Sequence, residues 1–204
     1  FKAHPWLSGP KESYLGFSER GGGASGEHSH AIHLWITICN MLGLGKVYKV
    51  QANMKENKAN NCHYDSICSL NLTTEQGFIG RCIQDVVTKP SRKYARLQGE
   101  KNFVEWYCCP GPDYDLVQTI DSSENLKLSS EKIQKTRPDD FIEELKHIHF
   151  CIENQDSFEE SPISLDKGLE VMRIIAAAQL SNKIGKEVSI DYNYISPEAC
   201  LSNT

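Results

Sequence analysis

Apolar residues recur along the chain with two periods, and each period predicts one kind of element. Between residues 28 and 42 they surround nearly the whole circumference of a helix, which predicts a largely buried helix that ends at Gly43. In residues 46–54 every second residue is apolar, which predicts a strand with one polar face. The apolar face of that strand carries Tyr48, Val50, Ala52 and Met54.

The same alternation continues through two hairpins. Residues 68–72 and 78–87 are predicted as strands around the turn TEQG, and residues 93–99 and 103–108 repeat the arrangement around the turn GEKN. Because these connections are too short for crossovers, we expect a meander of at least five strands that are mostly antiparallel.

The second half of the chain is predicted to be mainly helical. Residues 138–153 begin with an acidic first turn, which suits the N-terminus of a helix. A short strand at residues 188–192 is expected to join the edge of the sheet. Between them, residues 165–187 predict a long helix with an apolar stripe made of Leu165, Leu169, Met172, Ile175 and Ala176.

This order of elements predicts an α+β fold, in which helices pack on one face of a largely antiparallel (mixed), open-faced sheet. We expect one domain over residues 1–204, with residues 1–23 as an irregular lead-in rich in Pro, Gly and Ser. The sequence begins with Phe1 and not with Met, which indicates a processed protein or a fragment.

Composition excludes several kinds of partner. The 22 basic and 27 acidic residues give a formal net charge of -5 without any basic block, which argues against binding to nucleic acid. The apolar stretches fall short of the ~20 residues that a membrane span requires. The eight cysteines show no CxxC spacing, and we interpret them as reduced thiols in a cytoplasmic protein. Four of them lie singly in apolar runs: Cys39, Cys68, Cys82 and Cys151.

The segment GGGASGEHSHAIHLW, residues 21–35, concentrates the candidate chemistry. A dinucleotide-binding loop needs its glycines after a strand and before a helix, but no apolar strand precedes these glycines, so we predict turns. A metal site is also disfavoured, since His30 and His33 share a helix face while His28 points elsewhere, and no second cluster offers partners. We therefore assign no metal ligand.

A single catalytic histidine remains the third interpretation of this segment. An imidazole at the start of a buried helix, behind a glycine loop that a substrate can approach, suits general acid/base chemistry. A core histidine satisfied by a backbone carbonyl fits the spacing equally well. Glu27 could orient His30 or bind substrate hydroxyls, or it could simply cap a helix. Candidates for substrate binding are Tyr14, Arg20, His33, Asp85 and Arg92.

Three segments resemble motifs of one enzyme family, in the family's order. Residues 20–35 resemble the GGG…E-x-S-H-x-x-D segment that begins the C-terminal domain of the glucose-fructose oxidoreductase / inositol dehydrogenase (Gfo/Idh/MocA) family. Residues 64–106 resemble its strand meander with D-x-x-x-x-P-x-R and G-E-x-G-x-x-E-W, and residues 161–191 resemble its closing helix with G-K-x-V. The resemblance therefore spans nearly the whole chain.

The resemblance implies an enzyme of two domains, of which this chain is the second. In the family an N-terminal Rossmann domain binds NAD or NADP and supplies a lysine from a Glu-Lys-Pro motif, and neither is found in this sequence. The C-terminal domain forms the substrate pocket, and a histidine at the position of His30 exchanges a proton with a sugar hydroxyl while hydride moves. Glu27 stands three residues before this histidine, and His33 replaces an Asp of the family.

Three hypotheses follow for function. The first is the substrate domain of an NAD(P)-dependent oxidoreductase for a sugar, a cyclitol or a nucleotide-linked sugar, which the resemblance implies is a homo-oligomer through its open sheet face. The second is a non-catalytic sugar-binding or oligomerisation module of the same fold. The third is a metal-dependent hydrolase that uses the histidines.

Overall fold

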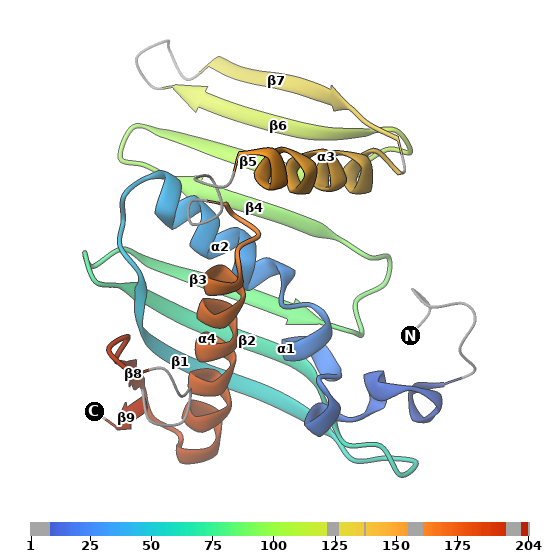
Figure 1. Cartoon of the computed structure of the whole chain (residues 1–204), viewed down its shortest axis with the longest axis vertical. Helices are drawn as coiled ribbons and strands as arrows, with labels where there is room; N and C mark the ends of the chain where they lie inside the picture. The colour runs from blue at the N-terminus through green and yellow to red at the C-terminus, as the bar shows by residue number, and fades with distance from the viewer. Residues whose placement is uncertain (1–8, 122–126, 137, 155–160, 195–200, 204) are drawn as a thin grey trace. The chain divides into compact units, whose positions relative to one another are not determined.

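The computed structural model describes residues 9–121, 127–136, 138–154, 161–194 and 201–203 (Figure 1). The chain divides into two compact units. The first comprises residues 1–87 and 159–204, and the second comprises residues 88–158.

The first unit is built on a five-stranded sheet with the strand order β3-β2-β1-β8-β9. All four pairs of neighbouring strands are antiparallel, as the alternation predicted. The terminal strand predicted at the sheet edge is β8, which instead lies between β1 and the outer strand β9. The strands are β1 Val47–Asn57, β2 Tyr64–Thr74, β3 Ile79–Asp85, β8 Val188–Ile190 and β9 Leu201–Asn203.

The alternating pattern of β1 determines which face of the sheet is buried. Val50 and Ala52 lie in the core opposite Leu72 and Leu70 of β2, so apolar residues meet across the two strands. Between β2 and β3 the predicted turn is present, and Gly77 adopts a left-handed φ of 80° there.

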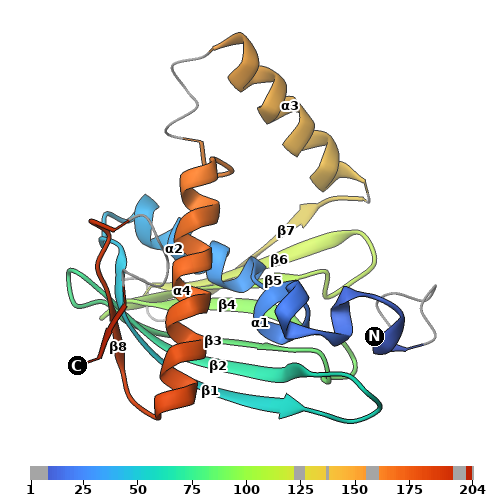
Figure 2. The same cartoon turned by 60° about the horizontal axis from the view of Figure 1, so that its bottom comes forward.

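Three helices cover this buried face, namely α1 Gly23–Glu27, α2 His30–Met41 and α4 Leu165–Ile184 (Figure 2). Before them, the lead-in forms three single-turn 3-10 helices: η1 Pro10–Glu12, η2 Tyr14–Gly16 and η3 Ser18–Arg20. The largely antiparallel sheet with helices on one face confirms the predicted fold class.

The prediction that α2 is largely buried is wrong. Only Ile32, Ile36 and Cys39 are buried, which is a single stripe at helical spacing. Met41, at the C-terminal end of α2, is 80% exposed. The apolar residues outside this stripe therefore led to the wrong prediction of burial on all sides of the helix.

The predicted stripe of α4 is only partly correct, because Ile175 is buried as predicted but the rest of the buried face differs. Leu165 and Met172 are 78% and 52% exposed, whereas the small residues Ala177, Ala178 and Ser181 are buried. The Ser181 hydroxyl explains this orientation, because it accepts the amide hydrogen of Ala52 in β1 at 2.9 Å. Small side chains let α4 approach the sheet closely enough for that bond.

The second unit contains four consecutive antiparallel strands and one helix. We expected the strands of this region to continue a single meander, but they form a sheet of their own, and two of the strands were not predicted. One of these, β7, has all eight residues exposed and therefore no apolar alternation. The elements are β4 Lys93–Gln98, β5 Asn102–Cys108, β6 Tyr114–Asp121, β7 Lys127–Gln134 and α3 Asp139–Glu153.

No helix among the described residues has the length and apolar character needed to cross a membrane.

Candidate functional site

The glycine segment is a tightly folded turn before α1. Gly21 and Gly23 have φ values of 85° and 90°, a left-handed conformation that glycine adopts without strain. A Cβ atom at Gly22 would overlap the backbone carbonyls of Tyr14 and Leu15. Gly22 therefore serves close packing of the backbone against the lead-in, and the left-handed Gly21 and Gly23 agree with the predicted turns.

A buried carboxylate that the sequence analysis missed holds α1 on the sheet. Asp65 of β2 is 4% exposed, and it accepts hydrogen bonds from the Ser25 amide at 2.7 Å and the Ser25 hydroxyl at 3.1 Å. A Cβ atom at Gly23 would overlap this carboxylate. In the sequence, Asp65 is distinguished only as a single acidic residue beside the apolar run of β2.

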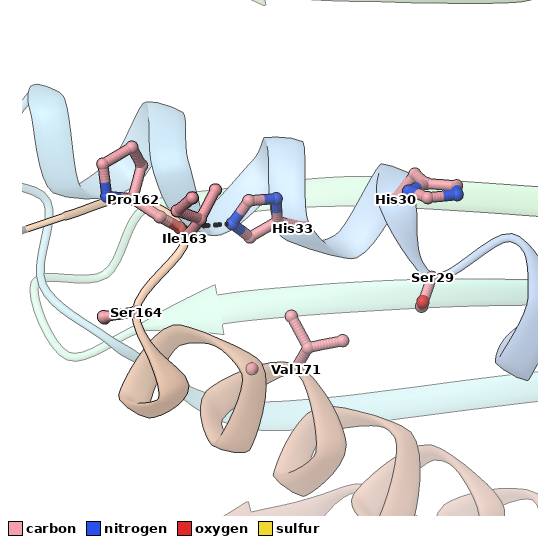
Figure 3. Close-up of a pocket in the computed structure, with 8 residues that line it drawn as sticks. Ser29, His30, His33, Pro162, Ile163, Ser164 and Val171 are labelled. Carbon is pink, nitrogen blue, oxygen red and sulfur yellow. Dashed lines mark hydrogen bonds between the residues drawn. The ribbon is translucent and has the colours of Figure 1, made fainter. Parts of the chain in front are cut away.

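The first turn of α2 presents two of the predicted histidines. His30 is exposed and makes no hydrogen bond to any described residue, whereas His33 is half-buried. The Nε2–H of His33 donates to the Pro162 carbonyl oxygen at 2.8 Å (Figure 3). The interpretation of a histidine satisfied by a carbonyl therefore describes His33, and His30 is the imidazole that stays available.

A cavity of about 320 Å³ lies between the start of α2 and the start of α4. Ser164 forms the N-cap of α4 with an extended backbone, and its buried hydroxyl makes no hydrogen bond to a described residue. The cavity thus combines an imidazole, a hydroxyl and the positive end of a helix dipole with apolar walls. Its lining residues are Ser29, His30, His33, Pro162, Ile163, Ser164, Gly168 and Val171 (Figure 3).

Tyr14 of η2 and Glu27 of α1 form a hydrogen-bonded pair. The Tyr14 hydroxyl donates to Glu27 Oε2 at 2.6 Å, and this bond raises the pKa of Tyr14 above its ordinary value of 10.0. Glu27 is the last residue of α1, so it does not occupy the first turn of a helix. Neither side chain is among the residues that line the cavity.

Comparison with known proteins depends on structure alone, because no family model and no curated protein matches the sequence. Aldose-aldose oxidoreductase from Caulobacter crescentus, solved with glycerol, superimposes with a TM-score of 0.70 at 16% identity over 90% of this chain. An NAD binding oxidoreductase from Klebsiella pneumoniae gives 0.66 at 11% identity over 87%. WlbA dehydrogenase from Bordetella pertussis, solved with NADH and UDP-GlcNAcA, gives 0.56 at 17% identity over 89%.

The chain has the fold of the C-terminal part of a Gfo/Idh/MocA-type oxidoreductase. It spans about half the length of these solved structures, which it covers to 52%, 53% and 50%.

Within this Gfo/Idh/MocA-type fold, three predicted substrate-binding residues are not among the residues that line the cavity. Arg20 stacks its guanidinium over Phe17 at 4.5 Å from the ring centroid. Asp85 ends β3 and accepts the amide hydrogen of Val87 at 2.8 Å. Arg92 belongs to the second unit, where it lies over a tyrosine ring. The structure thus brings His30 and His33 together in one cavity and gives these three residues other contacts.

The histidines at the start of α2, His30 and His33, belong to no group of three possible metal ligands among the described residues. Within the described residues, the one group of three His, Cys, Asp or Glu side chains close enough to share an ion lies in the second unit.

Proposed function

We propose that this chain is the substrate-binding domain of an NAD(P)-dependent oxidoreductase. The substrate is a sugar, a cyclitol or a nucleotide-linked sugar, and hydride moves between its carbinol carbon and the nicotinamide. One observation carries the proposal: His30, an exposed imidazole without a hydrogen bond to a described residue, lines a cavity in a domain with this oxidoreductase fold.

The ligands of the structural neighbours support this substrate class. The Caulobacter enzyme was solved with glycerol, and the Bordetella dehydrogenase with NADH and UDP-GlcNAcA. GenD2 from gentamicin A biosynthesis, which was solved with NAD, has a TM-score of 0.56 over 91% of this chain. The organic ligands bound with these enzymes are a nicotinamide dinucleotide or carry several hydroxyl groups, as a sugar or cyclitol does.

The residues of this chain fit the substrate side of the reaction better than the cofactor side. A Cβ atom at Gly22 would overlap backbone carbonyls and one at Gly23 would overlap the Asp65 carboxylate, so these two glycines serve packing within the chain and not the approach of a pyrophosphate. We therefore propose that NAD or NADP is bound mainly by a Rossmann domain encoded upstream of Phe1. When bound, the nicotinamide ring accepts or donates the hydride.

His30 supplies the proton transfer that accompanies hydride transfer. Oxidation of a carbinol releases a hydride and a proton, so R₂CHOH and NAD(P)⁺ give R₂C=O, NAD(P)H and H⁺. Loss of the hydride is easy only when the hydroxyl proton leaves with it. The exposed imidazole of His30 accepts that proton during oxidation and returns it during reduction.

His33 and Ser164 shape the cavity for the substrate. The Nε2–H of His33 is committed to Pro162, so His33 positions the segment before α4 and does not exchange protons through that nitrogen. Ser164 contributes the N-terminus of α4 to the same cavity. The Tyr14–Glu27 pair holds the end of α1 in place, one residue before the turn that leads to α2.

Assembly and compartment are part of the same proposal. Ile79 and Ile83 of β3 are exposed and alternate with the buried Cys82 and Gln84, so they lie on the face opposite the core, which suits a homo-oligomer through this open face. The seven cysteines that the structure describes are all free thiols, which supports a reducing compartment such as the cytoplasm.

The proposal is tested with the protein extended upstream of Phe1. We expect the upstream codons to encode a G-x-G-x-x-G turn after a strand and a Glu-Lys-Pro motif. Binding to the purified long protein should then change the fluorescence of NADH or NADPH. The protein should also reduce NAD⁺ or NADP⁺ while it oxidises at least one member of a panel of sugars, cyclitols and nucleotide-linked sugars. Sugar binding by a protein that binds neither cofactor would overturn the proposal in favour of a non-catalytic sugar-binding module.

A further inference from the structure

A cluster of two thiols and a carboxylate lies at the β5–β6 hairpin of the second unit. Cys108 ends β5, Cys109 follows it, and Asp115 is the second residue of β6. One ligand atom from each of the three residues lies within 4.8 Å of the other two. The cluster is independent of the cavity and of the proposed oxidoreductase activity.

The backbone departs from strand geometry in a way that brings the two sulfurs together. Adjacent residues of a regular strand point to opposite faces of the sheet, which would separate neighbouring cysteines. Cys109 instead has a φ of 47°, in the left-handed region that costs a non-glycine residue about 1 kcal/mol or more. Its amide donates to Asp115 Oδ1 at 2.8 Å, which fixes the turn.

The separation of the sulfurs matches a tetrahedral metal site. With a zinc–sulfur bond of about 2.3 Å, two sulfurs on a tetrahedral ion lie about 3.8 Å apart. Cys108 Sγ and Cys109 Sγ are 3.8 Å apart. The two thiols therefore already have the spacing of two zinc ligands.

The surroundings of Asp115 prepare the third ligand. Asp115 Oδ2 accepts hydrogen bonds from Trp106 Nε1 at 3.0 Å and from Lys135 Nζ, which is 3.1 Å away. Although burial opposes the shift, the hydrogen bonds from Cys109, Lys135 and Trp106 hold the pKa of Asp115 below its ordinary value, so this carboxylate is ionised at neutral pH. Outer hydrogen bonds of this kind orient carboxylate ligands in metal sites.

The charge and the chemical softness of the three ligand groups determine which ion the cluster would bind. Two thiolates and a carboxylate carry three negative charges, and the Lys135 ammonium offsets one of them, so a divalent cation would neutralise the cluster. A metal ion binds cysteine as thiolate, so it must displace the thiol protons of this cluster. Thiolate ligands favour Zn²⁺ and related soft ions over Mg²⁺ or Ca²⁺.

We propose that Cys108, Cys109 and Asp115 bind one thiophilic divalent cation of the Zn²⁺ class. Three protein ligands leave the fourth tetrahedral position for water or an external ligand, and the exposure of Cys109 gives that position access to solvent.

Cobalt provides a direct probe of the site, because Co²⁺ takes the place of Zn²⁺ and absorbs light when it is bound to thiolates. The full-length protein is reduced with a phosphine, stripped of metal and titrated with Co²⁺. We expect a thiolate-to-cobalt charge-transfer band that saturates at one equivalent and disappears when Zn²⁺ is added. Absence of this band, or a disulfide between the two cysteines that persists under the reductant, would overturn the proposal.

Substitutions of the three residues test whether each of them binds the ion. Cys108→Ser and Cys109→Ser should each weaken Co²⁺ binding ~100-fold or more, while Cys62→Ser, a free buried cysteine of the first unit, should leave binding unchanged. Asp115→Asn should keep the charge-transfer band but bind at least ~10-fold more weakly. Circular dichroism checks that each variant is folded. Wild-type affinity in the folded Cys109→Ser or Asp115→Asn variant contradicts the three-ligand site.

Discussion

His33 and Pro162 are joined by a hydrogen bond of 2.8 Å between the imidazole Nε2–H and the backbone carbonyl oxygen, across 129 positions of sequence. This bond connects the first turn of α2 to the segment that leads into α4. It therefore fixes one wall of the cavity that His30 lines.

Removal of this bond should loosen the cavity and leave the chemistry nearly intact. In His33→Ala we expect the free energy of unfolding to fall by about 1 kcal/mol, and KM for the substrate to rise with little change in kcat. His33→Gln keeps a donor and serves as the control, with a smaller effect on both quantities. Urea unfolding and steady-state kinetics measure them. A large fall in kcat with unchanged KM would assign His33 to the chemical step instead.

Tyr14 and Glu27 should act as one unit. Because the Tyr14 hydroxyl donates to Glu27, Tyr14→Phe and Glu27→Ala each break the same hydrogen bond. We expect both variants to lower kcat/KM by similar modest factors and the double variant to lose little more than either. A double-mutant cycle on kcat/KM measures this coupling. Strictly additive losses would show that the two side chains work independently.

Gly22 should not tolerate a side chain, whereas Gly168 should. A methyl group at Gly22 would overlap the backbone carbonyls of Tyr14 and Leu15, so Gly22→Ala is expected to cost about 1–3 kcal/mol of unfolding free energy. Gly168 lies inside α4, and no atom outside the helix backbone lies within 4 Å of the place that a methyl group would take, so Gly168→Ala should stabilise the helix by up to about 1 kcal/mol. Chemical denaturation of the two variants checks the opposite signs. Equal effects would contradict the tight packing of the glycine turn.

Glu170 should make the stability of the protein depend on pH. Its side chain is buried in α4, with Lys167 Nζ 3.9 Å from Oε2, and burial raises the pKa of its carboxyl above the ordinary value of 4.5. An acid with a raised pKa in the folded state contributes stability that is fully present below pH 4.5 and is lost as the pH rises through the folded pKa. Glu170→Gln should therefore be more stable than the wild type at pH 7, and the difference should shrink on acidification.

Urea unfolding of wild type and Glu170→Gln at neutral and acidic pH measures this difference. A variant that is less stable than the wild type at pH 7 would show that the attraction of Lys167 outweighs the cost of burying the charge.

The sequence predicted the parts of the fold whose burial follows a simple period. The alternation in residues 46–54 predicted β1 correctly, because one face of this strand is in the core and the other is not. The strand β7 could not be predicted in this way, since all of its side chains are exposed. The buried face of α4 was predicted only in part, at Ile175, because its contact with β1 also depends on small residues, such as Ala178 and Ser181, which a count of large apolar residues overlooks.

Only the part of the candidate site that lies within one short stretch of sequence, around His30, could be predicted. The resemblance pointed to His30, and the structure shows this imidazole lining a cavity. The opposite wall comes from Pro162 to Val171, far along the chain, and no local spacing relates the two segments. Asp65 and the cluster of Cys108, Cys109 and Asp115 depend in the same way on contacts between elements. Cys108 and Cys109 are visibly adjacent in the sequence, but a pair without CxxC spacing does not by itself indicate a metal site.

The most direct test of the proposed function is the rate of hydride transfer in His30→Ala of the full-length protein, with cofactor affinity measured in parallel. Single-turnover absorbance of the nicotinamide gives the rate, and fluorescence titration gives the Kd. We predict that the rate falls ~100-fold or more while the Kd for the cofactor stays nearly unchanged, because proton transfer is lost and the cofactor domain is untouched. Hydride transfer at the wild-type rate in this variant would contradict the role of His30 as the acid/base group.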